Sequence, residues 1–119
     1  MWTRYLALDA PYGNLVVAER ADRIVGFAFA ASSHVADAEN GHEPVRDLHL
    51  FSIYLLSAEQ GVGTGIALLD AAIGDQPAQL WVARENSRAR AFYERNGFRA
   101  DGVQVTDPDL GVIEIRMVR

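Results

Sequence analysis

Six consecutive residues between a predicted buried strand and a predicted helix carry the strongest chemical signal in the sequence: Gln60, Gly61, Val62, Gly63, Thr64 and Gly65. Glycine has no Cβ atom, so a ligand can approach this backbone closely and positive φ angles are allowed. The first N–H groups of the following helix have no acceptor within the helix, and the helix dipole adds partial positive charge there. The segment therefore predicts a site for a phosphate or pyrophosphate. The alternative is a tight strand-to-helix turn that needs glycine for its geometry alone.

Lysine and cysteine are absent from the 119 residues, and all 11 basic residues are arginine. This composition excludes a P-loop, which needs lysine, and a Schiff-base lysine. It also excludes a cysteine nucleophile, a disulfide and a cysteine-based zinc site. The dinucleotide pattern G-x-G-x-x-G fails as well, because the third glycine of the loop stands at position 65 and not at 66.

The chain is acidic, with a formal net charge of −5. We therefore expect no nucleic-acid partner, since affinity for nucleic acid depends on neutralising phosphates. Residues 84–99 run against this balance, with five arginines and two glutamates. They form either a local site for one small polyanion or a solvated helix face with ion pairs. The three histidines, at positions 34, 42 and 49, do not have the spacing of a metal site, and no metal is expected.

Hydrophobic patterning predicts an α/β fold, with one mixed sheet and helices packed on it. The predicted strands cover residues 15–19, 24–30, 48–56, 79–83, 98–105 and 112–118. The predicted helices cover residues 64–73 and a segment that begins after Asn86 or Ser87 and ends at Arg95. The length fits a single domain over residues 1–119.

Three segments share their motifs with one known family. The loop has the spacing Gln-x-x-Gly-x-Gly at Gln60, Gly63 and Gly65. Residues 52–60 look like that family's central strand and turn, and residues 80–98 look like its next strand and helix, with the ending Phe-Tyr-Glu-x-x-Gly-Phe. Over residues 14–119 the chain thus resembles the GNAT (N-acetyltransferase) superfamily. The resemblance implies a mixed, mostly antiparallel sheet with a splayed central pair of parallel strands, here 48–56 and 79–83.

The resemblance also implies a function, which is acetyl-CoA-dependent acetyl transfer to a primary amine by direct attack, without a covalent enzyme intermediate. Backbone N–H groups of residues 60–65 would hold the pyrophosphate of acetyl-CoA. Backbone groups at Tyr54 to Leu56 would pair with the pantetheine amides. The Leu55 N–H would also polarise the thioester carbonyl, a role that needs a preorganised donor. Ordinary strand pairing is the alternative for Leu55.

Four side chains receive further roles by the same resemblance. Asn86 would contact the pantetheine arm, cap a helix, or do both. Tyr93 would be the general acid for the departing thiolate, and Arg90 would meet the 3′-phosphate unless it lies on a solvated face. His49 stands where many family members carry a glutamate, so it is either the general base or a satisfied structural group. Two acidic residues are weaker candidates for the base, Glu43 and Asp47.

The largest departure from the family lies before the predicted strand pair at residues 15–30, where the family places a strand and two helices. Residues 2–8 are predicted to be a remnant of the second helix that packs through Trp2, Tyr5 and Leu6. The first strand and helix are thus predicted to be missing. The acceptor pocket would be open or completed by a partner subunit, or the natural start lies upstream. An exposed sheet edge favours a homodimer.

Targeting signals are not visible in the sequence, because it has neither a signal-peptide pattern at its start nor a long apolar run. We therefore expect a cytoplasmic protein without a membrane partner. Two other functions stay open. One is a non-catalytic module that binds acetyl-CoA or CoA, and the other is a structural partner that keeps the fold without a ligand.

Overall fold

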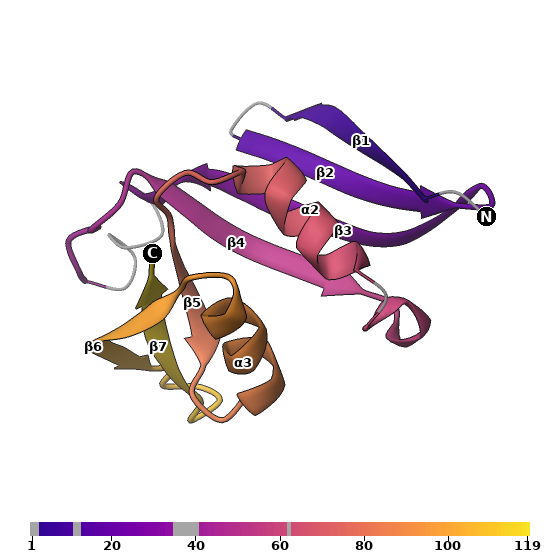
Figure 1. The fold of residues 1–119 in the computed structure, drawn as a ribbon. Helices are drawn as coiled ribbons and strands as arrows, with labels where there is room; N and C mark the ends of the chain where they lie inside the picture. Colours follow the sequence, from indigo (N-terminus) through magenta and orange to yellow (C-terminus); the bar gives the residue numbers. More distant parts are fainter. Residues whose placement is uncertain (1–2, 11–12, 35–40, 62) are drawn as a thin grey trace. The chain divides into compact units, whose positions relative to one another are not determined.

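A computed structural model describes the chain except for residues 1–2, 11–12, 35–40 and 62 (Figure 1). The chain divides into two compact units. The first unit contains residues 1–32 and 50–76, and the second contains residues 33–49 and 77–119. Each unit is described by itself below.

Four strands of the first unit are neighbours in the order β1-β2-β3-β4. They are β1 (Thr3–Ala10), β2 (Gly13–Arg20), β3 (Arg23–Ser32) and β4 (Leu48–Leu55), of which the first two residues of β4 fall in the second unit. β2 pairs antiparallel with both β1 and β3. Ala21 and Asp22 both have positive φ angles, 53° and 62°, at the turn between β2 and β3, as expected for a two-residue hairpin turn that matches the twist of its strands.

The segment at the start of the chain is a strand, so the prediction of a helix remnant at residues 2–8 and of a missing first strand is wrong. Every residue of β1 has a partner in β2, from Thr3 opposite Arg20 to Ala10 opposite Gly13. Leu6 lies opposite Val17 and Leu8 opposite Leu15. These leucines are two residues apart, which suits the alternation of a strand better than the helical stripe expected for this segment.

Helix α2 (Thr64–Ile73) packs on β1, β2 and β3 of the first unit (Figure 1). Its buried side chains include Leu68, Leu69 and Ile73. The sheet offers small residues to this helix, among them the fully buried Ala18 and Ala28. Asn14 of β2 donates through Nδ2 to the Ala72 carbonyl at 2.9 Å. This packing fixes where the amino end of α2 lies relative to the strands.

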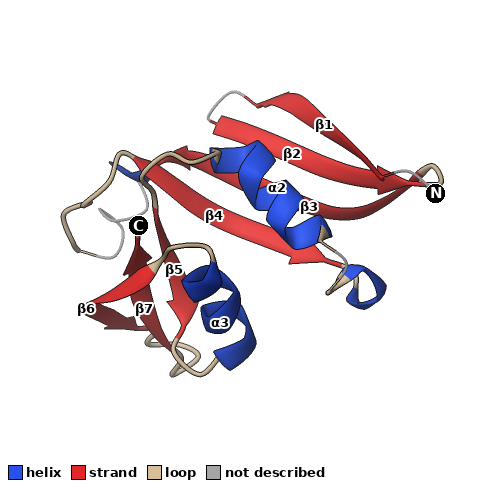
Figure 2. Cartoon of the chain, viewed as in Figure 1, coloured by secondary structure: helices blue, strands red, loops and turns tan. Residues whose placement is uncertain are grey.

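The described residues of the second unit include three strands of one sheet and the helix that follows the first of them (Figure 2). They are β5 (Gln79–Ala83), α3 (Ser87–Arg95), β6 (Arg99–Thr106) and β7 (Ile113–Val118), and β7 lies between β5 and β6 and is antiparallel to both. Its core is apolar and includes the buried Leu80, Phe98 and Met117.

The predicted helix at residues 64–73 is confirmed at both ends, and so is the predicted helix that begins after Asn86 and ends at Arg95. Every predicted strand end lies within two residues of the observed end. A short 3₁₀ helix, η1 (Ser57–Glu59), was not predicted. The splayed pairing of strands 48–56 and 79–83 stays a prediction. So does the single domain over residues 1–119.

Candidate functional site

The glycine loop follows η1 and leads into α2. Gly61 and Gly63 have φ angles of 85° and 89°, and a Cβ atom built on either would meet nothing within 4 Å. The loop therefore needs glycine because of its left-handed backbone conformation and not because of crowding. The space beside both residues is open to a ligand. Val62, which was assigned to the same site, lies outside the described residues.

The amino end of α2 offers backbone donors directly after this loop. The Ala67 N–H donates to the Gly63 carbonyl at 3.1 Å, so the N–H groups of residues 64–66 have no acceptor within the helix. No acidic residue lies in the first turn. These donors and the helix dipole can hold an anion.

The side chain of Thr64 lies inside the fold rather than in the loop's open space. Thr64 is 2% exposed, and its hydroxyl lies 3.4 Å from the Glu59 carboxylate. Gly65 is also buried. Only the backbone of these two residues is therefore a candidate for ligand binding, as the resemblance implied. Gln60, the remaining loop residue, donates its N–H to the Ser57 carbonyl at 3.2 Å, which leaves its carboxamide as the group to consider.

The end of β4 sets the direction of the Leu55 N–H. The Leu56 N–H donates to the Val25 carbonyl of β3 at 3.0 Å. Successive N–H groups of an extended strand point to opposite edges, so the Leu55 N–H points away from β3. Tyr54 is 54% exposed, and its ring stacks on Phe27 at 5.8 Å between centroids.

Gly26 of β3 allows the close approach of β4, and the sequence analysis missed it. A Cβ atom at Gly26 would come within 2.6 Å of the Tyr54 carbonyl oxygen and 2.8 Å of a Leu55 methyl group. Such contacts force the strands apart. A lone glycine within an otherwise apolar strand was the available signal, since it marks a bulge or a close backbone approach.

Two candidate residues of the second unit already have partners within it. Asn86 caps α3, and its Oδ1 accepts from the Ala89 N–H at 3.1 Å. This confirms the cap role and leaves the Nδ2 group as the candidate for pantetheine. Arg90 donates through Nη1 to the Arg84 carbonyl at 2.9 Å, which ties α3 to the segment before it.

Tyr93 lies in the aromatic part of the second unit's core. It is 8% exposed, and its ring makes edge contacts with Phe92 and Phe98 at 5.5 and 5.8 Å between centroids. Burial raises the pKa of Tyr93 to about 12. Tyr93 therefore stays protonated at neutral pH. Complete proton transfer to a thiolate of ordinary pKa, about 8.5, is uphill by about 5 kcal/mol, so hydrogen-bond donation to the sulfur is favoured.

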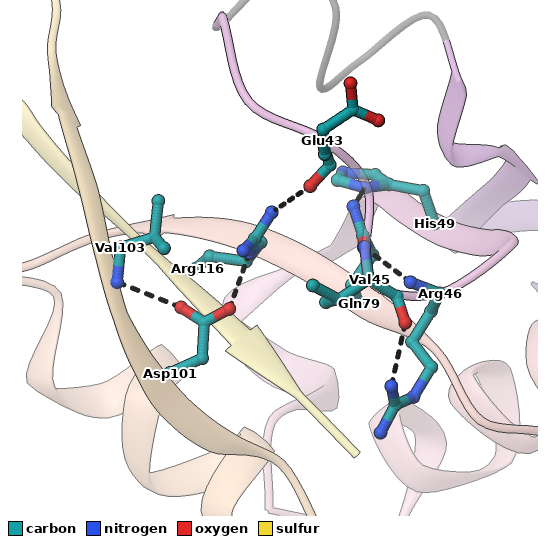
Figure 3. A network of polar contacts seen from close by, with 8 residues as sticks. All are labelled: Glu43, Val45, Arg46, His49, Gln79, Asp101, Val103 and Arg116. Carbon is teal, nitrogen blue, oxygen red and sulfur yellow. Dashed lines mark hydrogen bonds and ion pairs between the residues drawn. The ribbon is translucent and has the colours of Figure 1, made fainter.

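His49 and Gln79 form the centre of a buried polar network (Figure 3). The Oε1 atom of Gln79 accepts from the N–H groups of Val45 and Arg46 at 2.8 and 3.0 Å. This fixes the amide, so its Nε2 donates to His49 Nδ1 at 3.2 Å. Neutral His49 then carries its proton on Nε2. A protonated ring would set two donors against each other, so the contact favours the structural alternative for His49, while the base role stays a prediction.

Arg116 of β7 extends this network, because it contacts the segment of residues 43–46 that Gln79 also holds (Figure 3). It is 4% exposed, and its Nε atom lies 2.6 Å from Asp101 Oδ2. Its Nη1 donates to the Glu43 carbonyl at 2.9 Å, and its guanidinium lies 5.7 Å from the centre of the Trp81 ring. The buried charge is thus paired and hydrogen-bonded, as burial requires.

Among the described residues, no three or more His, Cys, Asp or Glu side chains lie together in a group that could hold a metal ion. No helix within the same residues is long and apolar enough to cross a membrane.

Comparison with known families identifies the class of protein. A family model described as an acetyltransferase (GNAT) domain matches residues 11–100. The chain therefore belongs to the GNAT acetyltransferase family, which confirms the resemblance stated above.

Individual relatives agree with this assignment. "Probable N-acetyltransferase Rv2775" of Mycobacterium tuberculosis is 32% identical over 71 residues, which are 57% of this chain and 41% of the relative. A solved structure from Corynebacterium glutamicum is described as "histone acetyltransferase HPA2 and related acetyltransferase". It has a TM-score of 0.64 at 28% identity, and the match covers 91% of this chain and 64% of that chain. Arabidopsis thaliana NAA60 in complex with acetyl-CoA has a TM-score of 0.68 at 13% identity, covering 92% and 77%.

These similarities confirm the predicted GNAT-like α/β fold. The chain spans less than half the length of the curated relative that it matches. The family and the fold are thus established, while the activity, the substrates and the partners of the chain are matters for proposal.

Proposed function

We propose that the chain is an acetyl-CoA-dependent N-acetyltransferase that moves an acetyl group to a primary amine by direct attack. The amine nitrogen attacks the thioester carbonyl carbon, so a C–N bond forms as the C–S bond breaks. A base takes the proton of the ammonium, and a donor stabilises or protonates the departing thiolate. No step requires a lysine or a cysteine, and the chain has neither.

The observation that carries the proposal is the backbone of the glycine loop. Gly61 and Gly63 are in the left-handed conformation beside open space, and they lead into a helix start without acidic side chains. Backbone N–H groups of the loop at residues 60–65 are proposed to hold the pyrophosphate, except that of Gln60, which donates to the Ser57 carbonyl. The open space leaves room for a ligand, and the support for the proposal is that it lies directly before the first N–H groups of α2, which have no acceptor within the helix.

The chemical step is assigned to two donors. The Leu55 N–H, which points away from β3, is proposed to polarise the thioester carbonyl, where negative charge develops. Tyr93 is proposed to donate to the departing sulfur. Its raised pKa of about 12 keeps the hydroxyl protonated throughout the neutral range.

Three further roles are proposed for side chains that also make contacts within the second unit. Asn86 Nδ2 would donate to the pantetheine arm while Oδ1 caps α3. Arg90 would meet the 3′-phosphate with the guanidinium nitrogens that do not hold the Arg84 carbonyl. His49 would act as base only if its contact with Gln79 rearranges.

Calorimetry with acetyl-CoA, followed by thiol release across a panel of amines, tests the function. We expect saturable binding and thiol release with at least one primary amine. Tyr93→Phe should lower kcat by about 10²-fold and leave the KM for acetyl-CoA nearly unchanged, since the lost donor acts in the transition state. Phe92→Leu is the packing control. An unaltered rate in Tyr93→Phe would remove Tyr93 from the mechanism.

A non-catalytic module that binds CoA is the second candidate. It is favoured by the occupied Nδ1 of His49 and by the short link between β1 and β2, where Ala10 pairs with Gly13. Binding without thiol release for every amine would support this candidate. A cytoplasmic location and a homodimer remain predictions, which fractionation and light scattering would test.

A further inference from the structure

Glu59, the residue directly before the glycine loop, is a buried carboxylate. It is 6% exposed, and burying an unpaired carboxylate is strongly unfavourable. Its Oε1 atom lies 3.0 Å from Arg20 Nη2 and 3.4 Å from Thr64 Oγ1. The carboxylate is thus paired with a cation from β2 and hydrogen-bonded to the first residue of α2.

The position of these contacts along the chain gives them a role in the loop. Glu59 immediately precedes residues 60–63, and Thr64 immediately follows them. The Glu59–Thr64 contact therefore joins the two ends of the loop. We call Arg20, Glu59 and Thr64 the loop clasp.

Arg20 is itself fixed by a neighbouring strand. Its Nε and Nη2 atoms donate to Thr3 Oγ1 at 2.9 and 2.8 Å. Its side chain is about one-third exposed, so the guanidinium is oriented by contacts on two sides. The clasp thereby connects the loop to the hairpin of β1 and β2.

We propose that Arg20 and Glu59 are positioning residues for pyrophosphate binding, an inference that rests on the proposed function. The clasp holds the loop ends, so the backbone donors are ordered before the ligand arrives and less entropy is lost on binding. Arg20 also cancels the charge of a carboxylate that lies next to the anion site. Without Arg20, the uncompensated Glu59 would repel the pyrophosphate.

Four variants and two ligands separate this role from a merely structural one. Arg20→Gln leaves Glu59 uncompensated and should weaken CoA binding by about tenfold or more. Glu59→Gln keeps an acceptor for Thr64 and should change CoA affinity by no more than about threefold. The double variant should return CoA affinity to within about threefold of the unaltered chain, because no charge is left unpaired.

The matched control is Arg4→Gln, which removes an arginine of the same hairpin that pairs instead with Glu19. It changes the net charge by the same amount and should leave CoA affinity unaltered. Pantetheine, which lacks the pyrophosphate, is the control ligand. Its affinity should be within about twofold in all four variants, whereas general damage to the fold would weaken both ligands together.

The outcomes divide clearly. If the unaltered chain does not bind CoA, the proposed function fails, and this inference fails with it. If CoA binds and Arg20→Gln has no effect, or weakens pantetheine equally, the inference alone is overturned. If Arg20→Gln does not fold, the double variant decides, and its failure to recover CoA binding would overturn the inference.

Discussion

The glycine loop of the first unit and the Asn86–Tyr93 segment of the second unit differ in the groups that they offer to a ligand. The loop offers backbone N–H groups beside open space, and the buried side chain of Thr64 belongs to the clasp. In the other segment, Asn86 caps a helix and Arg90 donates to the Arg84 carbonyl. The proposed ligand contacts of the loop are therefore made by the backbone, whereas those of the second unit are proposed for side chains that also stabilise the fold.

This difference affects how a substitution can be interpreted. A change in the loop alters the backbone conformation and should reach the ligand directly. A change that removes the Asn86 cap or the His49–Gln79 contact lowers stability, so a loss of binding in such a variant must be compared with its loss of stability.

The largest expected effect is on stability, at the buried Gln79 of the second unit. Gln79→Leu should lower the free energy of unfolding by about 3–5 kcal/mol, because two backbone N–H groups and the His49 Nδ1 each lose a partner. Urea denaturation followed by circular dichroism measures the change. Gln104→Leu on the exposed side of β6 is the control and should stay within about 0.5 kcal/mol. Equal effects would show that the network adds no stability.

The next effect concerns Tyr93 at alkaline pH. Because burial raises its pKa from 10.0 to about 12, the unfolded chain loses this proton at a lower pH than the folded chain. The free energy of unfolding should therefore fall by about 3 kcal/mol in all as the pH rises from about 10 to 12. Below about pH 10, the stabilisation that comes from protonated Tyr93 is fully present. Tyr93→Phe removes this term. Parallel stability curves for the two proteins over that range would contradict it.

The sequence predicted the local elements well and their long-range partners poorly. Helix 64–73 was predictable because its apolar stripe and its terminal Gly74 lie within the segment itself. β1 was not, because a strand is selected by its pairing with β2, and a short apolar segment fits either period.

The same distinction applies to the candidate site. The loop was recognised from the spacing of its glycines, which is a local property. The roles of Gly26 and Glu59 were missed because each depends on a residue far away in the chain, Tyr54 and Arg20 respectively. A lone glycine in an apolar strand signals a close approach at Gly26 without naming its partner, and no pattern within a short window could have indicated the Arg20–Glu59 contact.

Gly63 provides the direct test of the loop. Gly63→Ala forces a side chain into a φ of 89° and should cost about 1–2 kcal/mol of stability, together with a loss of CoA affinity of about tenfold. Gly102→Ala is the matched control, because Gly102 has a φ of 90° and also has open space beside it, but lies on β6. It should cost the same stability and leave CoA affinity unaltered. Equal losses of affinity in both variants would mean that strain, and not the loop, governs binding.

The smallest effect, at Asn86, separates its two roles. Asn86→Ala removes the cap and should cost about 1 kcal/mol of stability. Asn86→Asp keeps an oxygen that accepts from the Ala89 N–H but lacks the Nδ2 donor. If Nδ2 contacts the pantetheine arm, Asn86→Asp should retain its stability and bind acetyl-CoA severalfold more weakly, which calorimetry and urea denaturation measure together. Unaltered binding in Asn86→Asp would assign Asn86 to the cap alone, and the second unit would then contribute one fewer side chain to the ligand than the family resemblance implies.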